Sequence, residues 1–135
     1  MNAIESPGSK SIEYPDRTIE RAQLALRCSP FRLSLFSTMR DQSVELNAIG
    51  LESGRQKGYT KSNLTELACE NNLLWLIQVG LLRREVDGQG ITDSFRLTPL
   101  GRQLVEKYQQ EGGEIPQATV CDKVKNTFIR GLGFF

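Results

Sequence analysis

The stretch that decides the fold is Gly80–Gly101, GLLRREVDGQGITDSFRLTPLG. A glycine there closes an apolar helical pattern, a short strand-like run with adjacent arginines follows, and Gly88–Gly90 provides a turn. A second strand-like run ends in Thr98-Pro99, a pair that typically begins a helix. The stretch therefore predicts two antiparallel strands, over 81–87 and 91–97, placed between two helices.

Apolar periodicity and capping residues predict the helices around this hairpin. Ser29-Pro30 and Ser62 are expected to begin two of them, and Thr119 with Asp122 resembles a capping box. Asn71-Asn72 interrupts the longest apolar pattern, which leaves open a kink or a split into two helices. The helices are expected over 16–27, 30–41, 43–50, 62–79, 99–110 and from 119 onward, with a loop over 53–59.

The composition is that of one ordinary domain. The chain has 135 residues, of which 39% are hydrophobic and 24% charged, as in most single domains. Residues 1–15 are expected to form a flexible arm, residues 16–110 the domain and residues 111–135 a tail with a short amphipathic helix. No run of about 18 apolar residues and no signal-like N-terminus occur, so we expect a cytoplasmic protein without a membrane span.

The residue types present argue against catalysis. The chain has no histidine, which excludes Ser-His-Asp and Cys-His mechanisms and removes the commonest metal ligand. Gly88-Gln89-Gly90 lies in a hairpin, which is the wrong context for a phosphate-binding glycine loop. We therefore expect no enzyme, no metal site and no cofactor.

Three cysteines, Cys28, Cys69 and Cys121, stand far apart in the sequence. Their odd number and wide spacing argue against a disulfide framework and against a zinc site. We expect reduced thiols, with Cys28 and Cys69 as small core residues on helices. A redox-sensing thiol is the alternative.

The segment from Gly80 to Tyr108 resembles the helix–wing–helix end of winged helix-turn-helix regulators of the MarR, PadR and ArsR kind. In those families a GLL motif closes the recognition helix, a basic hairpin follows, and LTPLG begins the next helix. These pieces stand here as Gly80-Leu81-Leu82, Arg83–Arg96 and Leu97–Gly101. The resemblance implies a mainly α fold with a small β-hairpin, that is, a winged helix-turn-helix with extra N- and C-terminal helices.

The resemblance also implies a sequence-specific DNA-binding transcriptional regulator that works as a homodimer. The helix from Ser62 would enter the major groove of double-stranded DNA, where Asn63 can bond adenine and Glu66 can accept from cytosine. Cations before this helix and on the hairpin would contact phosphate or the minor groove. The first helix and the tail helix would pair the two copies. The residues implied in DNA contact are Arg55, Lys57, Lys61, Ser62, Asn63, Thr65, Arg83, Arg84 and Arg96.

A second interpretation is a winged-helix module that binds another protein and not DNA. The net charge is only +1, and the three hairpin arginines are offset by three hairpin acids. The expected recognition helix also carries Glu66 and Glu70, which repel phosphate. A continuous positive face joining Arg55, Lys61 and the hairpin would favour DNA, whereas alternating signs would favour a protein partner. The tail helix, with Val120, Val124 and Phe128 on one side and Lys123, Lys125 and Arg130 on its wet side, is expected to pack or dimerise and not to anchor in a membrane.

Overall fold

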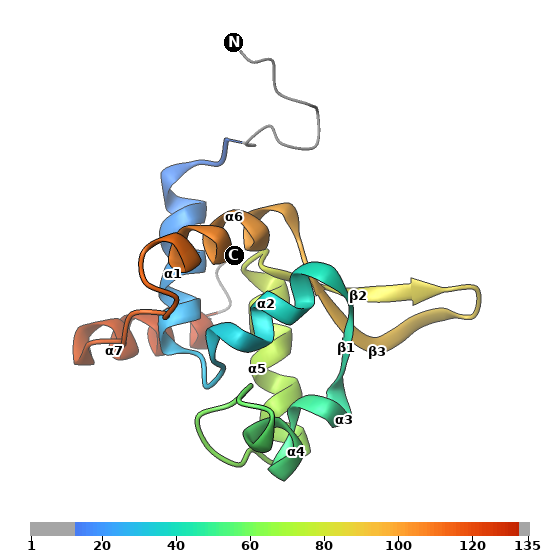
Figure 1. Cartoon of the computed structure of the whole chain (residues 1–135). Coiled ribbons are helices and arrows are strands. Elements are labelled where there is room, and N and C mark those ends of the chain that lie inside the picture. The colour runs from blue at the N-terminus through green and yellow to red at the C-terminus, as the bar shows by residue number, and fades with distance from the viewer. Residues whose placement is uncertain (1–12, 133–135) are drawn as a thin grey trace.

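The protein is mainly helical with a small antiparallel sheet (Figure 1). The computed structural model describes residues 13–132, so most of the expected N-terminal arm, residues 1–15, lies outside the described residues, as do residues 133–135. The elements are α1 (Asp16–Cys28), α2 (Leu33–Asp41), β1 (Val44–Glu45), α3 (Leu46–Ile49), α4 (Leu51–Gln56), α5 (Glu66–Gln78), β2 (Leu82–Asp87), β3 (Gly90–Leu97), α6 (Pro99–Gln110) and α7 (Val120–Leu132).

The sheet has the strand order β1-β3-β2, with both pairs antiparallel. Leu82, Phe95 and Leu97 are buried at its base, whereas the far end of the β2–β3 hairpin is exposed. The register shifts between Arg84 and Val86, which interrupts the regular pairing of the two strands at this point. The hairpin is thus anchored by apolar side chains at one end and projects from the body at the other (Figure 1).

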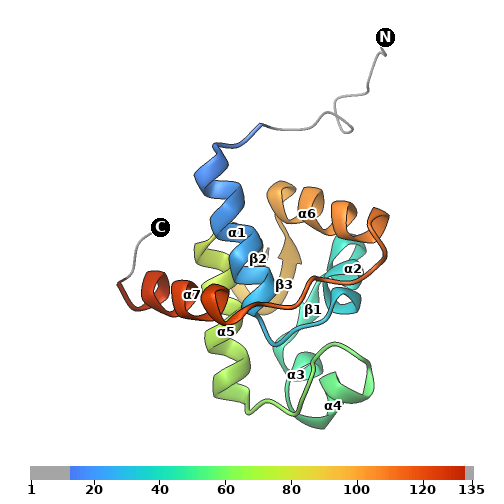
Figure 2. The ribbon, with the colours of Figure 1, turned by 90° about the vertical axis from the view of Figure 1, so that its left-hand side faces the viewer.

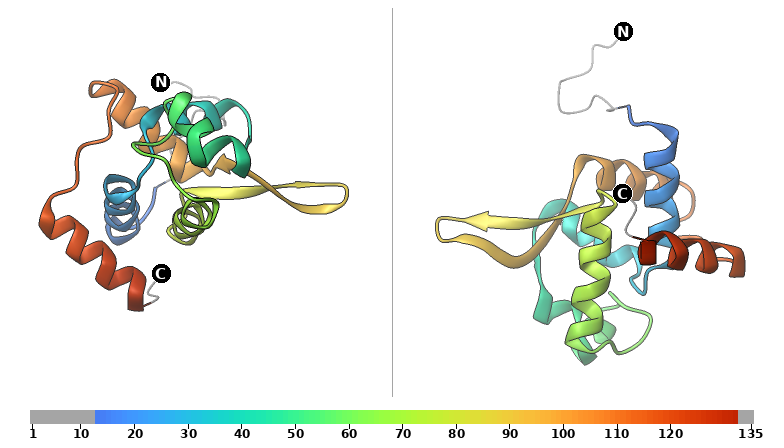
Figure 3. Two further views of the ribbon diagram at one scale, coloured as in Figure 1. Left: turned by 90° about the horizontal axis from the view of Figure 1, so that it is seen from below. Right: turned by 180° about the vertical axis from the view of Figure 1, so that it is seen from behind.

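Helix α5 lies at the centre of the core. It packs against α1, α3 and β2, and its Cys69, Leu73 and Leu76 are fully buried. Burial of a leucine side chain stabilises a fold by roughly 1.5–3 kcal/mol, so these positions fix which side of α5 faces inward. The hairpin projects on one side of the molecule, and α7 lies across α1 on the other (Figures 2 and 3).

The elements predicted from Gly80–Gly101 are confirmed to within one residue. Gly80 ends the α5 segment with φ +90, and the Leu81 N–H donates to the Leu76 carbonyl at 2.9 Å, as expected for a left-handed glycine C-cap. The Thr98 hydroxyl accepts a hydrogen bond from the Gly101 N–H at 3.1 Å and so caps α6. The expected tail helix is also present as α7.

The Thr119–Asp122 capping box is formed in both directions. The Thr119 hydroxyl accepts from the Asp122 N–H at 3.0 Å, and the Asp122 carboxylate accepts from the Thr119 N–H at 3.1 Å. Each contact satisfies a backbone donor that the first turn of a helix cannot satisfy within itself. This local signal therefore places the start of α7 correctly.

The start predicted for α2 is wrong: the helix begins at Leu33 and not at Pro30. Ser29 does not cap it, because the Ser29 hydroxyl donates to the Leu26 carbonyl at 2.9 Å and thus serves the end of α1. Phe31 forms a β-bridge with Thr60 instead. The chain stays extended over this linker because it pairs with a segment some thirty residues away.

The predictions for residues 43–65 also need correction. The expected short helix is present only as α3, and β1 precedes it; α4 replaces most of the loop expected over 53–59. Helix α5 begins at Glu66, where the Thr65 hydroxyl accepts from the Ala68 N–H at 3.1 Å, so Ser62 is not the cap. The Leu51 N–H donates to the Leu64 carbonyl at 2.7 Å, and this contact ties the segment before α5 to the start of α4.

Helix α5 runs without a break through Asn71-Asn72, so the pattern interruption there does not split it into two helices. The Asn72 side-chain N–H donates to the Ala68 carbonyl at 2.8 Å, a contact within the helix that leaves its backbone bonds in place.

Gly101 has no room for a side chain. A Cβ there would overlap the Leu81 carbonyl oxygen and would lie 2.9 Å from Leu97 Cδ2. We expect Gly101→Ala to lower the free energy of unfolding by about 2 kcal/mol, because backbone must move to relieve the overlap. Urea unfolding followed by circular dichroism measures this. Gly88→Ala is the matched control, since nothing lies within 4 Å of its added Cβ, and equal losses for both variants would contradict the packing at Gly101.

Candidate functional site

Two hairpin arginines share one carboxylate. Arg83 and Arg96 are cross-strand partners, and like charges placed opposite each other destabilise a strand pair. Glu85 reduces this repulsion, because its carboxylate accepts from Arg83 Nη1 at 3.1 Å and from Arg96 Nη1 at 3.3 Å. Both arginines are therefore paired within the hairpin itself, although one negative charge is shared between two positive ones.

Arg84 joins the hairpin to α5. Its guanidinium lies 2.8 Å from the carboxylate of Asp93 on β3 and 3.6 Å from that of Glu70 on α5. It also lies 5.1 Å from the centroid of the Phe95 ring, within the range of a cation–π contact. Arg84 therefore has a structural role in fixing the angle between the hairpin and α5.

The outward face of α5 and the hairpin tip expose large apolar side chains. We call Leu67, Leu74, Val86 and Ile91 together the α5–hairpin surface. Leu67 is 67% exposed and Ile91 is 74% exposed, and Ile91 pairs across the strands with the exposed Val86. In α5 and the hairpin together, five carboxylates stand against three arginines. The two elements thus combine exposed apolar side chains with two more carboxylates than arginines.

The residues implied in DNA contact before α5 do not form one group. Ser62 and Asn63 lie in the loop before the helix, and the Thr65 hydroxyl is occupied as its cap. Asn63 and Arg55 line one small hollow of about 300 Å³, and Lys57 is exposed just after α4.

Lys61 is directed elsewhere. Its ammonium group donates to the Ser29 carbonyl at 3.3 Å, and its backbone N–H donates to the Pro30 carbonyl at 3.0 Å. Lys61 thus belongs to a cavity of about 560 Å³ beside the end of α1. Sequence reasoning missed this cavity, because its cations come from four segments that no spacing pattern connects. Those cations are Arg27, Arg32, Lys61 and Lys123.

Helix α7 faces the body of the protein with a different side from the one predicted, since Arg130 was expected on its solvent-exposed side. Arg130 faces the body of the protein: it donates to the Asn72 side-chain oxygen at 3.1 Å and lies 5.8 Å from the Trp75 ring. Burial lowers the pKa of Arg130. Asn126 is buried and accepts from Trp75 Nε1 at 3.2 Å. The exposed side carries Val120, Val124 and Phe128.

Helix α1 and α7, the two helices expected to pair copies of the chain, pack against each other within one chain. Arg27 of α1 donates from Nε to the Asp122 carboxylate of α7 at 3.1 Å, and a second bond from Nη2 measures 3.3 Å. This bidentate contact is the best-defined polar link between the two helices. The homodimer stays a prediction, and the exposed apolar side of α7 is the part of this helix pair that remains open to a second copy.

The match to a protein family covers nearly all of these elements. Residues 12–130 match the Npun_F0494-like family. The chain belongs to this family. No curated protein and no solved structure matches the chain. The family match includes the α5–hairpin surface, the cavity and most of α7. Among residues 13–132 no helix is long and apolar enough to cross a bilayer, and no group of three potential metal ligands occurs there.

The three thiols, which are free as expected, differ in exposure. Cys69 is fully buried, and this burial raises its pKa to about 11. Cys28 is half-buried, and burial also raises its pKa. Cys121 lies exposed at the start of α7.

We expect a thiol reagent at pH 8 to modify Cys121 first, Cys28 slowly and Cys69 only after unfolding. A raised thiol pKa leaves the protonated form dominant at this pH, and only the thiolate attacks the reagent. Timed labelling followed by mass spectrometry measures the three rates. Labelling of Cys69 as fast as Cys121 in the folded protein would contradict this packing of α5.

Acid should release α7. The hydrogen bond from Arg27 and those from Thr119 hold the pKa of Asp122 below its ordinary value of 3.8. A depressed carboxyl pKa contributes stability above the ordinary pKa, and this contribution is lost as the pH falls through the folded-state value. We therefore expect α7 to loosen below about pH 4, which the fluorescence of Trp75, the single tryptophan, would report.

Asp122→Asn is the test variant for this acid transition, and Asp87→Asn on the hairpin tip is its control. The first should shift or abolish the change in Trp75 fluorescence at acid pH, whereas the second should leave it as in the wild type. An unchanged acid transition in Asp122→Asn would assign the transition to other carboxyl groups.

Proposed function

We propose that this chain is a winged-helix module that binds a partner protein on the α5–hairpin surface. The order of its elements supports the winged-helix part of the proposal. Helix α2, β1, the helices α3 to α5 and the β2–β3 hairpin follow one another, with β3 between β1 and β2. In this interpretation α5 occupies the position of the recognition helix and the hairpin is the wing.

One observation carries the choice of a protein partner. The surface where a winged helix would contact DNA exposes Leu67, Leu74, Val86 and Ile91 and has two more carboxylates than arginines. Binding to DNA depends on cations that displace counterions from phosphate, and α5 contains neither lysine nor arginine. Exposed apolar side chains rimmed by polar ones are instead typical of protein contacts.

The ion pairs of the hairpin strengthen this choice. Each arginine is already bound to a carboxylate at between 2.8 and 3.6 Å. A phosphate that approached Arg84 would also approach Asp93 and Glu70, and the attraction and repulsion would largely cancel. The same surface suits a partner segment with apolar anchors and flanking basic residues, which would face Glu66, Asp87 and Asp93.

The competing function is the DNA-binding regulator implied by the sequence resemblance. Arg55 and Lys57 favour it, because they are exposed and form no ion pair among the described residues. Two phosphate contacts would give a salt dependence with a slope of only about −2 in a plot of log affinity against log salt. A regulator that uses its wing arginines as well would show a steeper slope.

The proposal predicts partner capture that depends on the apolar side chains. A photo-crosslinking residue at Asn71, between Leu67 and Leu74 on α5, should trap a specific protein in the cells that produce this chain, whereas one at Lys107 on α6 should not. The double variant Leu67→Ser with Ile91→Ser should reduce the trapped product at least tenfold, because it removes two apolar anchors that the partner would cover. Arg55→Ser with Lys57→Ser is the matched control and should leave it unchanged.

The same variants separate the two functions. We expect fluorescence anisotropy with mixed-sequence duplex DNA at low salt to give the same result for the wild type and for the double variant Arg55→Ser with Lys57→Ser. Two results together would overturn the protein-binding proposal in favour of the regulator. One is salt-dependent DNA binding that is lost in Arg55→Ser with Lys57→Ser. The other is crosslinking that is unchanged in Leu67→Ser with Ile91→Ser. A crosslink formed by the purified chain alone would identify the partner as a second copy.

A further inference from the structure

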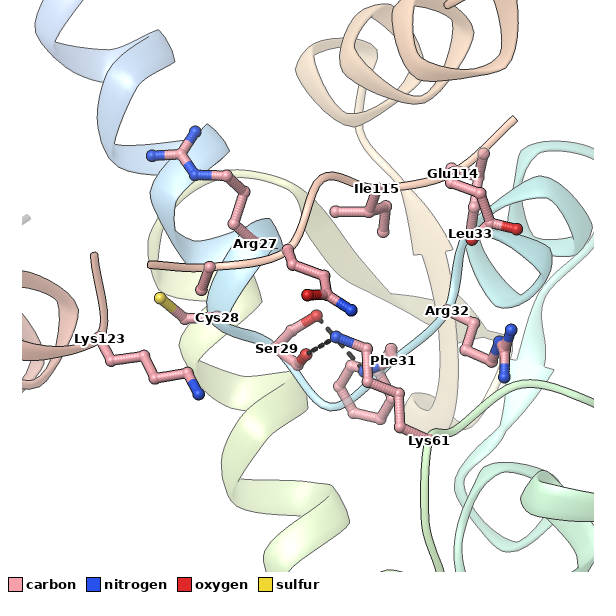
Figure 4. A pocket seen from close by; sticks show the side chains of 12 residues that line it. Arg27, Cys28, Ser29, Phe31, Arg32, Leu33, Lys61, Glu114, Ile115 and Lys123 are labelled. Atoms are coloured by element: carbon pink, nitrogen blue, oxygen red, sulfur yellow. Dashed lines mark hydrogen bonds between the residues drawn. The ribbon is translucent and has the colours of Figure 1, made fainter. Parts of the chain in front are cut away.

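The cavity beside the end of α1 has the size of a small-molecule site. Its volume of about 560 Å³ lies within the range of roughly 300–1,000 Å³ that such sites occupy. Its walls are the end of α1, the linker over 29–33, the Lys61 side chain, residues 114–118 and the first turn of α7 (Figure 4). Parts of the chain that are far apart in the sequence thus meet around one space.

This cavity concentrates positive charge. Four cations and one carboxylate, that of Glu114, line it, whereas the whole chain has a net charge of +1. Arg27 is paired with Asp122, but Arg32, Lys61 and Lys123 form no ion pair within residues 13–132. Unpaired cations around a hollow raise the local concentration of anions.

Lys61 is held in position before any ligand arrives. Its ammonium donates to the Ser29 carbonyl, and its own N–H donates to the Pro30 carbonyl. The Arg32 N–H donates to the Tyr59 carbonyl at 2.8 Å and ties the same two segments together a second time. One ammonium hydrogen is used in this way, which leaves two for a ligand. Lys123 reaches toward the Ser29 turn from the α7 side (Figure 4).

Part of the lining is apolar. Leu33 and Ile115 contribute side chains on the other side of the cavity from Lys123 (Figure 4), and Ala118 adds a methyl group. A ligand made only of a charged group would leave this part of the wall in contact with water. A small apolar body joined to an anionic group would cover it.

We propose that this cavity binds a small organic anion. Lys61 and Lys123, with Arg32 at the rim, would hold a carboxylate or a phosphate monoester, and Leu33 and Ile115 would contact the apolar part of the ligand. Because residues 114–118 and Lys123 line this cavity together with Arg27 and Cys28 of α1, a bound anion would also hold α7 and its linker against α1. This site is separate from the α5–hairpin surface and does not rest on the function proposed for it.

Binding of benzoate and of phenyl phosphate tests the proposal, with benzyl alcohol as the neutral probe of similar size and chloride to match the ionic strength. Amide NMR titration of the wild-type chain should show saturable shifts over 29–33, at 61 and over 114–118 with at least one anion. The stronger of the two anions identifies the charged group. The neutral alcohol should bind at least tenfold more weakly, since it offers no partner for the ammonium groups.

Two pairs of variants locate the site. Lys61→Gln and Lys123→Gln should each raise the Kd about tenfold through loss of a charge-assisted hydrogen bond. Lys57→Gln and Lys125→Gln are the controls. Each removes one positive charge close in sequence to Lys61 or Lys123, but neither residue lines the cavity, so the Kd should stay unchanged. Protection of Cys28 from thiol reagents by the bound anion, in a Cys121→Ser background, is a second measure of occupancy because Cys28 lines the cavity.

Three results would overturn the proposal. They are equal binding of benzyl alcohol, equal weakening by the lysine changes inside and outside the cavity, and no saturable shift with either anion at millimolar concentration. The first would indicate an apolar hollow, the second a general effect of charge, and the third that the cavity binds no ligand of this class.

Discussion

Burial of one side of α5 between α1, α3 and β2 is the constraint on which the rest of the molecule depends. Cys69, Leu73 and Leu76 must point inward for the core to close. With a period of 3.6 residues, Leu67 and Leu74 are then directed outward together with Glu70 and Asn71. The outward face of α5 is thus a consequence of the core, and this helix contributes no basic side chain to it.

Arg84 transmits this constraint to the hairpin. Its contacts with Glu70, Asp93 and the Phe95 ring link the outward edge of α5 to both strands. A partly exposed ion pair contributes only about 0.5 kcal/mol in isolation. Three contacts on one guanidinium restrict its direction more than any one of them would, and they engage a cation that could otherwise meet phosphate.

The sequence predicts best what local contacts decide. The β2–β3 hairpin, the Thr98 cap of α6 and the Thr119–Asp122 box depend on residues within a few positions of one another, and all are confirmed. The start of α2 is misplaced because a distant segment decides it, whereas that of α5 is misplaced because Thr65 and not Ser62 is the cap. Phe31 pairs with Thr60, which keeps the α1–α2 linker extended and Lys61 beside Ser29. No pattern in the sequence shows such a pairing.

Dependence on contacts between distant segments also explains why the sequence does not predict the candidate sites. The charge balance of the hairpin is visible in the sequence, but the pairing of Glu85 with both Arg83 and Arg96 depends on the strand register and on the shift in it. The cations of the cavity become neighbours only through tertiary contacts, namely the Phe31–Thr60 bridge and the packing of α7 against α1. Their positions in the sequence, 27, 32, 61 and 123, share no period from which a site could be inferred.

Helix α7 shows how an amphipathic pattern can mislead. Its apolar side chains repeat every four residues, yet the helix docks through Asn126, Arg130 and Asp122, which bond to Trp75, Asn72 and Arg27. Polar contacts of this kind stabilise a packed helix less than burial of an aromatic side chain such as Phe128 would. The helix is therefore attached to the body less firmly than the buried elements are. A helix held in this way can respond to a ligand at its first turn, where Lys123 lines the cavity, because little burial must be lost for it to move.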